Sequence, residues 1–180
     1  MAHATGYALF DTAIGRCAIA WGARGITRCA LPAADEEALR RHIARGVPHA
    51  GEQPAPPAIA AAITRIVARL AGARDDLRDL VLDLDDIPEF HRRVFATARA
   101  IAPGNTVTYG ELARRLGTPG AARAVGQALG ANPFPIVVPC HRIVAADGSL
   151  GGFSAPGGAR TKRRMLQIEG AIAQADIGFE

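Results

Sequence analysis

A cysteine followed directly by a histidine is the pair of residues in this sequence best suited to covalent chemistry. Cys140 and His141 lie in an apolar, proline-rich segment that reads N-P-F-P-I-V-V-P-C-H-R over residues 132–142. A thiol is a strong nucleophile only as the thiolate, and an imidazole can accept its proton when a turn or a bridging water brings the two side chains together. The segment therefore predicts nucleophilic attack by Cys140 with help from His141.

The other two cysteines, Cys17 and Cys29, lie in apolar segments and are predicted to be small core residues. Three cysteines are few and odd in number, which argues against a disulfide scaffold and fits a reducing compartment. A zinc site made from Cys17, Cys29 and distant histidines is the alternative, but the sequence has no C-x2-C pair. We therefore expect neither a metal nor a cofactor.

Two short helices are predicted upstream of the nucleophile. Residues 108–117 predict one helix, because Thr108 and Glu111 have the spacing of a capping box and a glycine ends the segment. Residues 121–130 predict a second helix after a tight turn, so the pair matches a helix-turn-helix with the second helix as recognition helix. We expect Cys140 at the bottom of a pocket that faces this second helix.

The recognition helix is unusual in composition. It carries small residues at Ala122, Ala124 and Gly126, and only Arg123 and Gln127 have long side chains. Small residues permit close approach to sugar and phosphate, and an arginine there can enter the base stack or contact a phosphate. The alternative is a plain helical hairpin with no nucleic-acid partner.

Charge is distributed unevenly along the chain. The net charge is +4, but residues 1–90 carry 10 Lys/Arg and 12 Asp/Glu, whereas residues 91–180 carry 11 and 5. The second half is thus basic, which suggests that it meets a polyanion, although charge that serves solubility is the alternative. With no apolar run of roughly 18 residues and no signal-peptide pattern, we expect a cytoplasmic protein without membrane association.

The sequence predicts an α+β protein in two parts. Residues 1–85 predict a small αβ domain with antiparallel strands, and residues 86–180 predict a mainly helical domain that contains the helix-turn-helix and Cys140. A helix that begins near Pro88 is expected to open the second domain. The elements expected in the first domain are strands over residues 6–10, 16–21, 26–31 and 80–85, helices over residues 35–45 and 59–70, and a proline-rich loop over residues 46–57.

Several motifs in a fixed order resemble the O6-alkylguanine-DNA alkyltransferases, also called methylated-DNA–protein-cysteine methyltransferases. The strong resemblance covers about residues 86–170, and the first 85 residues match only loosely. The motifs are Tyr109, Ala122-Arg123-Ala124-Val125-Gly126, Asn132-Pro133, Pro139-Cys140-His141-Arg142, Gly152-Phe153-Ser154 and Glu169-Gly170. The resemblance implies irreversible transfer of an alkyl group from O6-alkylguanine, with O4-alkylthymine as a further substrate, in double-stranded DNA to the protein, without an obligate protein partner.

The resemblance also implies roles for residues of the active site. Cys140 would accept the alkyl group, and His141 would deprotonate it through a water while Glu169 holds the other ring nitrogen. Asn132 would tie the recognition helix to the active-site turn. Tyr109 would hydrogen-bond guanine N3 and help to protonate the leaving base.

Further implied roles concern DNA and the displaced base. Arg123 would fill the space that a flipped guanine leaves in the duplex. Backbone groups near Cys140 and Ile143, together with Ser154, would contact that guanine. Phe153 would form a wall of the pocket at a position where family members often have tyrosine, so the sequence leaves open whether methyl or bulkier groups are preferred.

Two other functions compete with DNA repair. A lesion sensor would keep the fold and bind DNA, but such members of the family lack the acceptor cysteine that this chain keeps as Cys140. A cysteine hydrolase using Cys140 and His141 would turn over repeatedly and would not need Arg123.

Overall fold

A four-stranded sheet forms the first half of the structure, a computed structural model that describes residues 3–173. Strands β1 (Ala4–Thr12), β2 (Gly15–Gly22) and β3 (Gly25–Ala30) are consecutive and antiparallel, as predicted. The short strand β4 (Gly51–Glu52) then pairs with β1 in the parallel sense, which gives the order β3-β2-β1-β4. The sheet is therefore mixed, and β4 lies in the segment over residues 46–57 that the sequence predicted as a loop.

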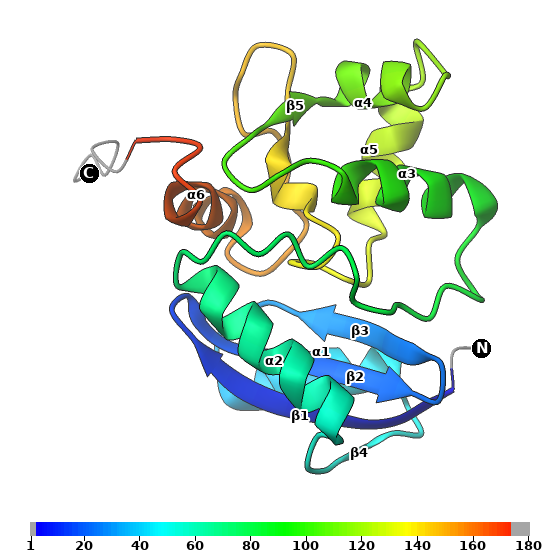
Figure 1. Ribbon diagram of the computed structural model, residues 1–180, viewed down its shortest axis with the longest axis vertical. Coiled ribbons are helices and arrows are strands. Elements are labelled where there is room, and N and C mark those ends of the chain that lie inside the picture. Colours follow the sequence, from blue (N-terminus) through cyan, green and yellow to red (C-terminus); the bar gives the residue numbers. More distant parts are fainter. Residues whose placement is uncertain (1–2, 174–180) are drawn as a thin grey trace.

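Helices cover both faces of this sheet (Figure 1). Helix α1 (Glu36–Gly46) begins at Asp35, whose carboxylate accepts a hydrogen bond from Ala38 N at 2.7 Å, so the predicted cap is present. Helix α2 (Pro57–Leu70) lies on the opposite face. Because side chains alternate along a strand, β2 sends Ile19 toward the main core and Ala20 toward a smaller core under α1.

The segment over residues 80–85 does not form the predicted strand. It makes a single parallel bridge with β3, in which Ile26 N donates to Val81 O at 2.9 Å. Further along the same edge of β3, Cys29 N donates to Pro133 O at 2.8 Å. The loop that contains Pro133 therefore pairs with the rest of this edge, where residues 80–85 would have to continue as a strand. The leucine alternation reflects partial burial against the core and not a ladder of strand hydrogen bonds.

The second half of the described chain is mainly helical and lies on the sheet half (Figure 1). The predicted helix after Pro88 is present, and its buried side chains include Val94 and Phe95. Thr108 caps the first helix of the helix-turn-helix, since its hydroxyl accepts from Glu111 N at 3.1 Å. The elements are α3 (Glu89–Arg99), β5 (Val107–Thr108), α4 (Tyr109–Arg115), α5 (Ala122–Gly130), the 3-10 turn η1 (Cys140–Arg142), β6 (Ile143–Val144) and α6 (Gly158–Ile168).

One apolar core runs through both halves. It includes Ile19 from the sheet and Ile66 from α2, and it continues to Phe95 and Phe134, whose rings meet edge-on with centroids 6.4 Å apart. The division into domains 1–85 and 86–180 stays a prediction, and its last residues, 174–180, lie outside the described part of the chain. Within residues 3–173, no helix has both the length and the apolar character needed to cross a membrane.

Candidate active site

Cys140 begins a tight turn that the preceding loop holds in place. Asn132 follows α5, and its side chain donates to Val138 O at 3.1 Å and accepts from Phe134 N at 2.8 Å. Ile136 in the same loop has φ of +78°, a conformation that costs a non-glycine residue roughly 1–3 kcal/mol and needs such support. Asn132 therefore connects the end of the second helix to the turn that carries the cysteine.

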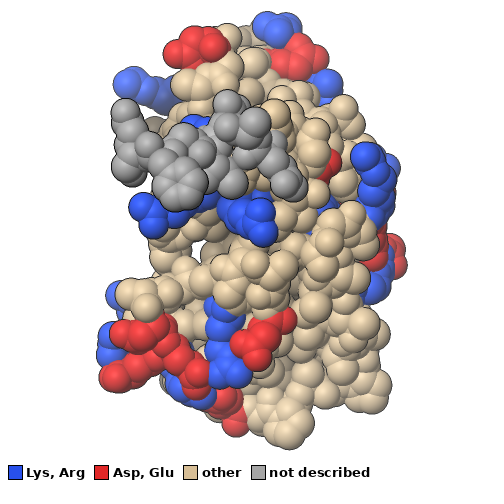
Figure 2. Space-filling model, turned by 90° about the vertical axis from the view of Figure 1, so that its left-hand side faces the viewer, with Lys and Arg blue, Asp and Glu red and all other residues tan. Residues whose placement is uncertain are grey.

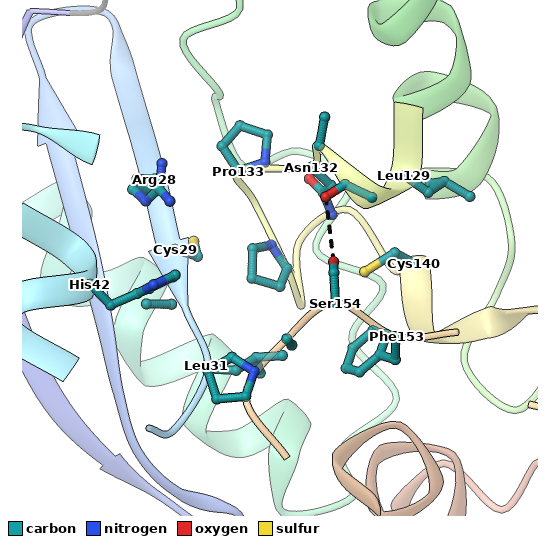
Figure 3. A pocket seen from close by; sticks show the side chains of 16 residues that line it. Arg28, Cys29, Leu31, His42, Leu129, Asn132, Pro133, Cys140, Phe153 and Ser154 are labelled. Carbon is teal, nitrogen blue, oxygen red and sulfur yellow. Dashed lines mark hydrogen bonds between the residues drawn. The ribbon is translucent and has the colours of Figure 1, made fainter. Parts of the chain in front are cut away.

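Two cavities meet at Cys140. One has a volume of about 630 Å³ and lies between the helix pair and the loop after β6; its lining residues include Tyr109, Gly126, Cys140, Phe153 and Ser154. The other, of about 290 Å³, lies between Cys140 and β3. Figure 3 shows this second cavity, with the Cys140 sulfur pointing into it beside Phe153 and Ser154. Leu129 and Gly130 of the second helix line both cavities, so the cysteine faces this helix, as the sequence predicted.

His141 and Glu169 form a buried pair behind the cysteine. His141 Nε2 lies 2.5 Å from Glu169 Oε1. The other ring nitrogen, Nδ1, is buried and has no hydrogen-bond partner among residues 3–173. Burial, followed by the positive charges of Arg142, Arg69 and Lys162, lowers the pKa of His141 well below its usual value. The ring is therefore neutral near pH 7, with one nitrogen held and the other available to accept a proton.

The electrostatic surroundings of Cys140 act in opposite directions. Burial raises the pKa of the Cys140 thiol, whereas a hydrogen bond from Asn132 and the positive charge of Lys162 lower it. Burial dominates, so Cys140 is mainly a thiol at neutral pH. It needs a proton acceptor before it can attack, because the thiolate is the nucleophile.

Lys162 is a site residue that the sequence analysis missed. Although basic, it is fully buried. Its Nζ donates to Ile143 O at 2.5 Å and lies 6.0 and 5.7 Å from the ring centroids of Tyr109 and Phe153. Spacing offered a signal, because Lys162 lies three residues before Met165 on the buried stripe of α6.

Glu169 binds other groups besides His141. Arg142 binds both carboxylate oxygens, through Nε and Nη2 at 2.9 Å each, and Gly104 N donates to Oε2 at 3.3 Å. Arg69 of α2 also donates to Oε1. Arg69 was not predicted to be a site residue, and Arg142 was predicted only as part of its motif.

The predicted substrate-contact residues have different positions. Tyr109 begins α4, and its ring packs beside Gly126 of α5 at the border of the larger cavity. Phe153 and Ser154 line both cavities, and the Ser154 hydroxyl donates to Gly130 O at 3.4 Å. The Ile143 side chain is fully buried and lines neither cavity.

The second helix presents a mixed face. Arg123 and Gln127 are exposed one turn apart, whereas Ala122, Ala124 and Gly126 are partly buried. Arg123 lines an open groove of about 610 Å³ that also contacts Tyr109. Within residues 3–173 the structure gives Arg123 no ion-pair partner, so its charge is free to meet an anion.

Basic side chains also gather elsewhere in the second half. Figure 2 shows the side of the molecule on which α6 lies, with lysine and arginine side chains grouped around the middle of this face and acidic and basic side chains mixed below. The exposed cations that α6 supplies are Arg160, Arg163 and Arg164. This arrangement agrees with the basic charge of the second half.

No group of three potential metal ligands from His, Cys, Asp and Glu occurs within residues 3–173. Cys17 and Cys29 belong to the main core, as predicted. Burial raises the pKa of each of these two thiols to about 12, which leaves them protonated near pH 7. Cys140, which is partly exposed and lines both cavities, is therefore the better placed thiol for chemistry.

The helix pair and the cysteine pocket behind it define a DNA-binding protein with a cysteine acceptor, and comparisons identify its family. Residues 89–171 match the family described as 6-O-methylguanine DNA methyltransferase, DNA binding domain. A methylated-DNA–protein-cysteine methyltransferase from Mycobacterium tuberculosis is 43% identical over 124 residues, which cover 69% of this chain and 73% of that protein. The chain belongs to the O6-methylguanine DNA methyltransferase family.

Two further comparisons extend over the first half. The crystal structure of Mycobacterium tuberculosis OGT in complex with DNA has a TM-score of 0.73 and 35% identity, and the match covers 93% of this chain and 94% of that one. The regulatory protein ada from Salmonella typhimurium is 39% identical over 91% of this chain, but this chain spans only 45% of that protein. The loosely matched first half thus has the family's fold.

Proposed function

We propose that this protein repairs alkylated DNA by moving the alkyl group from O6 of guanine to Sγ of Cys140. The observation that carries this proposal is the position of Cys140 between the His141–Glu169 pair and a cavity bordered by the second helix. The names of the relatives, which describe transfer from methylated DNA to a protein cysteine, support the same reaction.

The reaction is a displacement at the alkyl carbon. His141 Nδ1 accepts the thiol proton through a water, the Cys140 sulfur forms a bond to the carbon, and the bond from carbon to O6 breaks. Glu169 holds Nε2 and stabilises the imidazolium that results. The electron pair leaves with guanine, and the Tyr109 hydroxyl, hydrogen-bonded to N3, helps to protonate the leaving base. Asn132 keeps the cysteine turn in register with the recognition helix.

Duplex DNA binds on the recognition helix, and the damaged guanine leaves the base stack to reach Cys140. Ala122, Ala124 and Gly126 permit close approach of the DNA backbone. Gln127 contacts the DNA near this point, and Arg123 fills the space that the flipped base leaves in the stack. The related mycobacterial protein was crystallised with DNA, which supports this partner.

The flipped base occupies the cavity of about 630 Å³. Phe153 forms its wall, and Ser154 together with backbone groups near Cys140 and Ile143 makes the polar contacts. The Ile143 carbonyl already accepts from Lys162, so any contact from that oxygen to guanine uses its second lone pair. O4-alkylthymine offers a similar oxygen-linked alkyl group and is proposed as a secondary substrate.

The thioether product is neutral and has no group placed to release it, so each molecule acts once. Intact mass spectrometry after incubation with a duplex containing O6-methylguanine tests this directly. We expect one added methyl group on Cys140 per molecule and no further consumption of excess substrate. Continuous turnover would support the cysteine hydrolase instead, and DNA binding without a mass change would support a lesion sensor.

We also propose a cytoplasmic location and action without an obligate protein partner. The three cysteines are free thiols in the structure, which fits a reducing compartment. A thiol acceptor that must stay reduced requires such conditions. Relatives come from Mycobacterium tuberculosis and Methanothermobacter thermautotrophicus.

A further inference from the structure

Arg69 is a buried cation from the sheet half of the molecule that reaches the active site. It lies in the last turn of α2 and is only 4% exposed. Its Nη2 donates to Oε1 of Glu169, a residue 100 positions later in the chain. The end of α2 lies near α6 in Figure 1, in agreement with this contact. Nothing in the chemistry described above requires a cation at this position.

Arg69 binds the same oxygen of Glu169, Oε1, that binds His141. Glu169 Oε1 receives His141 Nε2 at 2.5 Å, Arg142 Nη2 at 2.9 Å and the Arg69 guanidinium, whereas Oε2 receives Arg142 Nε and Gly104 N. A carboxylate oxygen shared by three donors gives each of them less of its negative charge. Arg69 therefore weakens the hold of Glu169 on a protonated His141.

The charges around His141 act in the same direction. The groups around it are Arg69 from α2, Arg142 and the preceding Cys140 from η1, Lys162 from α6 and Glu169 directly after α6. Three of these five are cations and one is an anion while Cys140 remains a thiol. Arg69 is one of the cations that lower the pKa of His141.

We propose that Arg69 is a positioning residue for alkyl transfer: by sharing Glu169 Oε1, it keeps His141 neutral and ready to accept the Cys140 proton. The proposal rests on the proposed function, because it concerns the residue that accepts the Cys140 proton in that reaction. Arg69 does not touch the reacting atoms and acts through Glu169.

The test is the titration of His141, followed by nuclear magnetic resonance of the imidazole nitrogens in full-length protein. The neutral variant Arg69→Gln removes the charge but keeps a donor to Glu169. We expect the His141 midpoint to rise by roughly one pH unit, because removing a nearby like charge favours the protonated ring. The other histidines of the chain serve as internal references.

The transfer reaction provides the second readout. With free O6-benzylguanine, the acid side of the pH–rate profile should move to higher pH together with the His141 midpoint. Arg69→Lys, which restores the charge, should return both midpoints toward the wild-type values. Arg65→Gln is the matched control, since Arg65 lies one turn earlier on α2 and pairs with Asp75 and Asp79 instead of Glu169.

The outcomes separate the two proposals. A wild-type protein that gains no alkyl group contradicts the proposed function, whatever Arg69 does. A wild-type protein that transfers the group, beside an Arg69→Gln variant with an unchanged His141 midpoint, overturns the role of Arg69. If Arg69→Gln does not fold, Arg69→Met is the second neutral variant, and an unchanged midpoint there counts equally against the proposal. A lower unfolding temperature without a shift in midpoint would assign Arg69 a structural role only.

Discussion

His141 Nε2 and Glu169 Oε1 are 2.5 Å apart, and both side chains are almost completely excluded from solvent. The carboxylate in this pair also forms ion pairs with Arg69 and Arg142. Glu169 therefore has two separable roles, one in holding the proton acceptor and one in compensating buried positive charge.

Glu169→Gln should destabilise the fold as well as slow the reaction. The variant leaves Arg69 and Arg142 buried without a carboxylate, and breaking a buried ion pair in this way costs about 3–5 kcal/mol. Urea unfolding monitored by circular dichroism measures the change in the free energy of unfolding. Glu111→Gln is the control, because Glu111 also binds two arginines but at the surface, and its loss should be far smaller. Equal losses in the two variants would contradict the buried role of Glu169.

Cys140→Ser should abolish alkyl transfer and leave DNA binding intact. A hydroxyl has a far higher pKa than a thiol, so His141 cannot ionise it usefully, while the recognition helix is unchanged. Intact mass measures transfer, and a gel-shift titration with an O6-methylguanine duplex measures binding. Cys29→Ala is the control and should still accept one alkyl group. A label that maps to Cys17 or Cys29 in the wild type would show that the acceptor is misassigned.

Arg123→Ala should slow repair of duplex DNA much more than reaction with free O6-benzylguanine. An arginine in the vacated stack stabilises the flipped state, whose formation costs a few kcal/mol, and a free base has no stack to leave. We expect a rate loss of about tenfold or more on duplex only, measured in single-turnover assays. Arg115→Ala is the control, since Arg115 is exposed on α4 and pairs with Glu111. Equal loss on both substrates would point to a folding defect.

Local signals in the sequence predicted much of the architecture. Asp35 and Thr108 accept hydrogen bonds from the helix residues expected of caps, and the antiparallel strands and the helix-turn-helix lie where turn residues and spacing placed them. The prediction of a strand over residues 80–85 was wrong. The alternation of leucines reports burial, but it cannot show that the edge of β3 also pairs with Pro133.

The buried cations of the site were harder to predict. Lys162 is one of four basic residues of α6, and its spacing from Met165 indicates burial but does not separate it from Arg163, which lies three residues before Leu166. Arg69 falls seven residues after Ala62 and three after Ile66, both on the buried stripe of α2, which is a detectable signal for burial. Its partner, Glu169, is 100 residues away, and nothing local to α2 indicates that contact.

Lys162 provides the final prediction, which concerns the pH dependence of the nucleophile. Its positive charge lowers the pKa of Cys140 against the larger opposing effect of burial. Lys162→Met removes that charge, so the Cys140 pKa should rise further and the thiolate should become rarer at neutral pH. An opposite charge nearby shifts a pKa by about one unit or more, so transfer from free O6-benzylguanine at pH 7 should slow by about tenfold. Raising the pH should recover part of this loss, because more thiol then ionises.

The measurement is the single-turnover rate from about pH 6 to pH 10, a range that spans the ordinary thiol pKa. Arg163→Met is the matched control, because Arg163 is the next residue of α6, carries the same charge and is exposed. Its profile should follow that of the wild type. If Lys162→Met instead lost the same factor at every pH, the lysine would act by holding Ile143 O, Tyr109 and Phe153 in place and not through the charge on the thiol.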